Sequence, residues 1–103
     1  MDLEAVRQHL SELKDRDMVV RQRAVEALVE LGADTSEVAT ALTVALADAS
    51  SGVRRRAAQA LGKLGAAAQS AVPQLTEATR DRVHTVRDAA RDSLATIKAA
   101  TGG

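Results

Sequence analysis

The 103-residue sequence contains no cysteine, phenylalanine, tryptophan or tyrosine, and it has a single proline. Without cysteine, the chain can form no disulfide, no thiolate zinc site and no cysteine nucleophile. Without aromatic rings, it offers no side chain on which a nucleic-acid base could stack. No apolar run approaches the length of a membrane span, and the charged start at Asp2, Glu4 and Arg7 does not resemble a signal peptide. These features predict a soluble, cytoplasmic protein.

An excess of charge of one sign is also missing, since 14 basic residues balance 14 acidic ones. The balance varies along the chain. Residues 1–34 carry eight acidic and five basic side chains, residues 35–67 carry two and four, and residues 68–103 carry four and five. A protein held mainly by nucleic-acid phosphates has a large basic excess. The composition therefore disfavours nucleic acid as the partner.

The sequence does contain an internal repeat, in which residues of the same kind recur at intervals of 33. The recurring sets are Asp15, Asp48 and Asp81; Val20, Val53 and Val86; Arg21, Arg54 and Arg87; Ala24, Ala57 and Ala90; Leu28, Leu61 and Leu94; Leu31, Leu64 and Ile97; and Gly32 with Gly65. A register kept across three copies is the signature of a repeat protein.

The apolar residues within each copy have the spacing of one face of an α-helix, not the alternation of a strand. Two helices are predicted per copy. The first helices are expected over residues 2–14, 35–47 and 70–80, and the second helices over residues 17–32, 50–65 and 83–99.

Several residues fit the ends of these helices. Asp34 followed by Glu37 has the pattern of a capping box, and Ser70 is a candidate N-cap with Pro73 in the first turn. Gly32 and Gly65 stand where a helix end favours a residue with positive φ.

The run D-x4-V-R-x2-A-x3-L-x2-L-G over residues 48–65 resembles the HEAT repeat, in particular its short bacterial class. The resemblance covers essentially the whole chain and implies an all-α fold, a right-handed α–α superhelix of three helical hairpins with six helices. The expected single domain spans 1–103, with repeats of about 1–33, 34–66 and 67–103. Ankyrin repeats share the 33-residue length, but the chain has no T-P-L-H stretch, and tetratricopeptide repeats need aromatic residues.

Projected on a helix, Val25, Ala58 and Arg91 share one flank of the second helices. A fourth repeat would have to bury Arg91, so the third copy is expected to be a polar terminal cap.

The resemblance further implies that the recurring aspartates and arginines form a structural ladder, in which each Asp holds an inter-helix turn and each Arg bridges to that turn or to the neighbouring repeat. This ladder consists of Asp15, Arg21, Asp48, Arg54, Asp81 and Arg87. Residues that recur in every copy are better explained by structure than by a unique site.

By the same analogy, the exposed positions of the second helices form a ridge that lines the concave, partner-binding surface. The ridge comprises Gln22, Glu26, Arg55, Gln59, His84, Asp88 and Asp92. The spacing of the last three along one helix is too long for them to converge on a metal, and Arg55 is expected to balance Asp88.

No constellation of residues indicates catalysis, and no cofactor or metal is predicted. We expect a non-catalytic scaffold that binds another protein or a peptide segment, as a monomer or weak homo-oligomer. Two alternatives stay open: a nucleic-acid or phosphate-ligand binder, for which Arg54, Arg55 and Arg56 are the densest basic cluster, and a purely structural or designed repeat protein.

Overall fold

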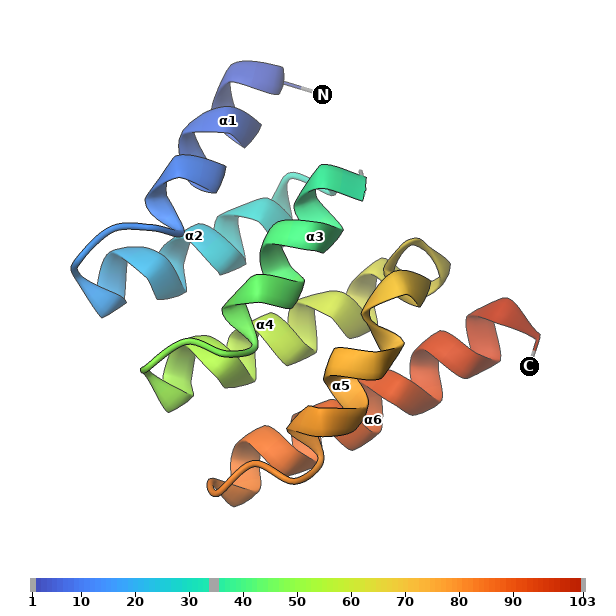
Figure 1. Ribbon diagram of the computed structural model, residues 1–103. Helices are drawn as coiled ribbons and strands as arrows, with labels where there is room; N and C mark the ends of the chain where they lie inside the picture. The colour runs from blue at the N-terminus through green and yellow to red at the C-terminus, as the bar shows by residue number, and fades with distance from the viewer. Residues whose placement is uncertain (1, 34–35, 103) are drawn as a thin grey trace.

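The computed structural model describes residues 2–33 and 36–102, and the regular elements of this part of the chain are all helices (Figure 1). The elements are α1 (Leu3–Glu12), α2 (Met18–Glu30), α3 (Ser36–Ala45), α4 (Ser51–Leu64), the 3-10 helix η1 (Gly65–Ala71), α5 (Val72–Ala78) and α6 (His84–Thr101). The prediction of an all-α protein is confirmed.

Polar side chains cap several of these helices. The Asp2 carboxylate accepts hydrogen bonds from the backbone N–H groups at the start of α1, and Asp17 does the same at the start of α2. Ser50 caps α4 through its hydroxyl. Gly32 and Gly65 follow helix ends with φ of 66° and 59°, a conformation that costs side-chain-bearing residues energy, as expected from the sequence.

The segment before α5 differs from the prediction. Ser70 is not an N-cap: α5 begins at Val72 after Ala71, which makes no side-chain capping bond, and Pro73 lies in the first turn as expected. Residues 65–71 instead form η1, in which Ala68 and Ala71 are fully buried. Their spacing of three matches the 3-10 period, so both methyl groups point into the core. The predicted capping box at Asp34 lies outside the described residues.

The helices form two layers (Figure 1). Helices α2, α4 and α6 lie side by side in one layer, where α4 packs against both of its neighbours. Helices α1, α3 and α5 form the other layer, each packed on the helix that follows it in the chain. The molecule measures 34 × 29 × 17 Å along its principal axes, a thin slab that places one long face of every helix near solvent.

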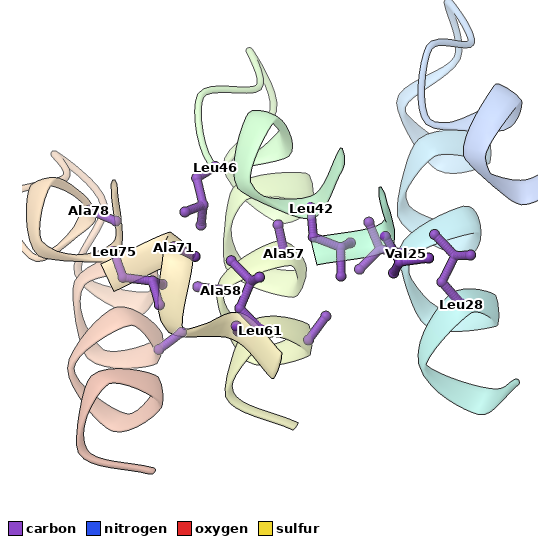
Figure 2. Close-up of a cluster of buried hydrophobic side chains, with 14 of the residues drawn as sticks. Val25, Leu28, Leu42, Leu46, Ala57, Ala58, Leu61, Ala71, Leu75 and Ala78 are labelled. Carbon is purple, nitrogen blue, oxygen red and sulfur yellow. The ribbon is translucent and has the colours of Figure 1, made fainter. Parts of the chain in front are cut away.

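Leucine and alanine side chains fill the space between the layers (Figure 2). The largest fully buried side chains include Leu28, Leu42, Leu61 and Leu75. Alanines between them allow the helices to approach closely, and burial of each leucine contributes about 1.5–3 kcal/mol. The core therefore runs through every repeat and is not concentrated in one place.

Candidate interaction surface

The inter-helix turns are held by the recurring aspartates. Asp15, Asp48 and Asp81 each accept a hydrogen bond through Oδ1 from the backbone N–H two residues later, at 2.8, 2.8 and 2.9 Å. This bond fixes the entry into the second helix of each pair. In α6, where Val83 offers no side-chain cap, the Asp81 bond to the Val83 N–H does this directly.

The arginines join each turn to the next repeat. Arg54 donates from Nε and Nη2 to the two carboxylate oxygens of Asp81, at 2.8 and 3.2 Å, while its Nη1 donates to the carbonyls of Asp48 and Ala49. Arg21 repeats the pattern toward Asp48, at 2.9 and 3.1 Å. Each arginine thus binds its own turn and the following turn with one side chain, in the bidentate geometry that strengthens charged hydrogen bonds.

The environment of Asp81 shifts its acidity. Burial acts to raise the pKa of Asp81, but the hydrogen bond from Arg54, the bond from the Val83 N–H, and the charges of Arg54 and Arg82 lower it, and the pKa lies below 3.8. The carboxylate is therefore ionised at neutral pH, as the ion pair with Arg54 requires.

The ridge residues lie along the layer of α2, α4 and α6. Those on α6 are exposed, as are Glu26 and Gln59, while Gln22 and Arg55 are half-buried. The ridge is hollowed between successive helices. A groove of about 770 Å³ runs between α4 and α6, and a smaller hollow of about 350 Å³ lies between α2 and α4.

The larger groove has charges of both signs on its walls. From α4 come Arg55, Gln59 and Lys63, and from α6 come Asp88 and Asp92. The expected ion pair between Arg55 and Asp88 is not found among the described residues. The Oδ1 atom of Asp88 instead lies 3.5 Å from Nη1 of Arg91 on its own helix. Both walls of the groove therefore carry charged side chains.

The side chains of the three consecutive arginines of α4 have different surroundings. Arg54 belongs to the ladder, and Arg56 donates from Nε to Glu26 of α2 at 2.6 Å. The Arg56–Glu26 pair was not expected from the sequence, although its separation of 30 residues is close to the repeat length and could have indicated it. Arg55 lines both hollows of the ridge.

A further groove, which the sequence did not indicate, lies between α1 and α3 in the opposite layer. It encloses about 860 Å³, and its walls include Leu10, Leu13, Ala41 and Val44. Val44 is 72% exposed, more than the other exposed large hydrophobic residues of the described chain. The helical period alone is enough to predict that Val44 lies outside the core. It does not predict the groove beside Val44.

Among residues 2–33 and 36–102, no three His, Asp or Glu side chains are placed to hold a metal ion together. His9 contacts Glu12 at 2.7 Å on α1, whereas His84 lies at the start of α6, so the two imidazoles belong to the first and last helices.

A family model described as HEAT repeats matches residues 4–95, which is most of the chain. No curated protein matches the sequence. None of the helices in the described residues has the length and apolar character needed to cross a membrane.

Proposed function

The chain belongs to the HEAT repeat family, whose repeats generally mediate protein–protein interaction. From this we propose that the chain is a non-catalytic scaffold that binds a protein segment along the ridge. The observation that carries the proposal is the groove between α4 and α6, which is open and lined by charges of both signs. Such a surface suits a polar segment that carries complementary charges, for which electrostatics sets orientation and specificity more than affinity.

The proposal keeps the expected architecture of one domain over residues 1–103, with three repeats in a right-handed superhelix and the ridge on its concave side. The cytoplasm remains the proposed location. Three repeats offer a small surface, so binding is expected to be modest and to weaken with salt.

A charge-reversed double variant tests the ridge. Arg55→Glu with Asp88→Arg keeps the net charge but exchanges the signs on the two walls of the groove. The expected result is loss of the proteins that the unmodified chain captures from its native lysate, with the helical circular dichroism unchanged. The matched control is Glu77→Arg with Arg80→Glu, two exposed residues in and beside α5 in the opposite layer. Equal capture by both variants would remove the ridge from the proposal.

Nucleic-acid binding has less support, because two of the three clustered arginines already have carboxylate partners within the chain. A retardation assay at two salt concentrations distinguishes the two functions, since phosphate binding weakens steeply as salt rises.

A further inference from the structure

The two ends of the helical array carry complementary halves of the contacts that join its repeats. Each arginine of the ladder pairs with an aspartate 27 residues later. Arg87 still donates through Nη1 to its own turn, at 2.7 Å to the Asp81 carbonyl, but its Nε and Nη2 have no acceptor among the described residues. At the other end, the Asp15 carboxylate binds its own turn and no described arginine. One end therefore lacks an aspartate and the other lacks an arginine.

Continuing the repeat arithmetic brings these two residues together. Three repeats of 33 residues span 99 positions, so the position 27 residues after Arg87 corresponds to Asp15 of a second copy. The same rule applies to the Glu26–Arg56 pair, which joins residues 30 apart. Its equivalent at the end of the array is Asp92 with Arg23 of a second copy. Both side chains are exposed, and neither has an ionic or hydrogen-bonding partner in the described part of the chain.

The packing surface between the second helices also continues across this junction. Gly62 of α4 lies so close to α6 that a Cβ on it would stand 3.0 Å from the Ser93 Cβ. At the equivalent contact of α2 with α4, Val29 and Ala60 line a shared hollow. In the junction, the corresponding residues are Ala95 and Ala27 of a second copy. Two alanines are intermediate in size between these two pairs, so the helices can pack at a spacing within the range that the array already uses.

From these three matches we infer that a second copy of this chain stacks head to tail on the first, with its α2 packed on α6. Residues 1–34 carry three more acidic than basic side chains, and residues 68–103 carry one more basic than acidic, so the net charges of the two ends attract weakly in this orientation. Arg91, expected from the sequence to block a further repeat, is 60% exposed in the single chain. In the stack it lies beside Ala27 of the second copy, and Glu30 of that copy, one turn further along α2, supplies a carboxylate.

Stacking of this kind is heterologous, so an open stack keeps one free α2 end and one free α6 end however many copies have joined. Its geometry differs from that of the ridge, where the proposed partner binds, because the junction uses the flanks of α2 and α6. Asp92 belongs to both surfaces, because it also lines the groove of the ridge. Arg23, Ala27 and Ala95 are not ridge residues, so substitutions at these three positions separate the two proposals.

Engineered cysteines test the register directly, because the chain has none of its own. A disulfide requires Cβ atoms about 3.5–4.5 Å apart, the separation expected between Ala27 and Ala95 across the junction. The variant Ala27→Cys, mixed with a tagged Ala95→Cys variant under mild oxidation, is expected to give a disulfide-linked dimer. Replacing Ala95→Cys with Ala99→Cys shifts the thiol by about 6 Å along α6 and should prevent the link. Equal cross-linking from both positions, or dimers of Ala27→Cys alone exceeding the mixed dimer, would overturn the register.

Charge reversal tests the association itself by sedimentation velocity at low salt. The unmodified chain is expected to show an average mass that rises with concentration past that of a dimer and falls at about 1 M salt, where the Debye length is about 3 Å. Arg23→Glu and Asp92→Lys should each weaken association about tenfold, because each sets like charges face to face. The equimolar mixture of the two variants should recover association, since every junction between unlike copies again joins opposite charges.

Two further variants serve as controls: Lys63→Glu and Glu37→Lys make the same charge changes in the middle repeat and should leave the mass distribution unchanged. Because the side chains of Arg23 and Asp92 are exposed and make no hydrogen bond or ion pair with a described residue, their replacement should not alter the circular dichroism. A monomer at every concentration, a mass that stops at two copies, or a mixture that fails to recover would each refute head-to-tail stacking.

Discussion

Replacing Arg54 with alanine measures how strongly the ladder holds the repeats together. Arg54 is 9% exposed and makes two hydrogen bonds to Asp81 and two to carbonyls of its own turn. Its removal leaves the Asp81 carboxylate, only 12% exposed, with the Val83 N–H as its remaining donor among the described residues. Breaking a largely buried ion pair from one side costs about 3–5 kcal/mol, since the other charge stays buried. That is a large share of the ~5–15 kcal/mol that stabilises a domain.

Arg87→Ala is the matched control. Arg87 makes the same two carbonyl bonds to its own turn but has no carboxylate partner in the described part of the chain. We expect its replacement to cost about 1–2 kcal/mol, the contribution of the two turn bonds alone. The difference between the variants, about 2–3 kcal/mol, then belongs to the contact with Asp81.

Urea unfolding followed by far-ultraviolet circular dichroism is the suitable assay, because the chain has no aromatic residue for fluorescence. Dilute protein at moderate salt keeps any association out of the measurement. A double-mutant cycle with Asp81→Asn should give a coupling energy of the same size as the difference between the two arginine variants. If Arg54→Ala and Arg87→Ala destabilise equally, the inter-repeat ion pair contributes no net stability and the reasoning fails.

Three other predictions concern the core and the pH dependence. Leu61→Ala should lower the free energy of unfolding by about 2–5 kcal/mol in urea titrations, since Leu61 is fully buried; a loss below 1 kcal/mol would contradict its place in the core. Gly62→Ala should lower the free energy of unfolding by about 1–3 kcal/mol, because the added Cβ would lie 3.1 Å from the Ser93 Cα. Gly32→Ala is the matched variant that separates crowding from backbone strain, because Gly32 has a positive φ but open space around it. The pKa of Asp81 is lower in the folded than in the unfolded chain, so the unfolded chain binds more protons and the free energy of unfolding falls as the pH drops below about 4. The difference in free energy of unfolding between the unmodified chain and Asp81→Asn should therefore become smaller at low pH. A difference that does not depend on pH would argue against the lowered pKa.

Much of the fold followed from the 33-residue period. Apolar residues at helical spacing located the second helices to within two residues at each end, because those helices bury a continuous stripe that the sequence displays. The segment before α5 was harder to predict. Ser70 is a residue type that favours the N-cap position, but burial of Ala68 and Ala71 against the neighbouring helices outweighed this preference of Ser70.

The contacts between repeats could be predicted only in part. The sequence showed that Arg and Asp recur together, but whether Arg54 reaches its own turn or the next one depends on the distance between repeats, and in the structure it reaches both. The groove beside Val44 depends on how far apart α1 and α3 lie, which no periodicity encodes. The ridge assignments remain predictions, because side-chain exposure does not identify a partner.

The ladder has a consequence for how such a chain can change in length. Every repeat contributes an aspartate to the joint before it and an arginine to the joint after it, at fixed positions. Excising one whole 33-residue unit from the middle would bring Arg21 opposite Asp81, and duplicating that unit would add one more matched pair. Insertions and deletions of complete units therefore leave no interior charge unpaired.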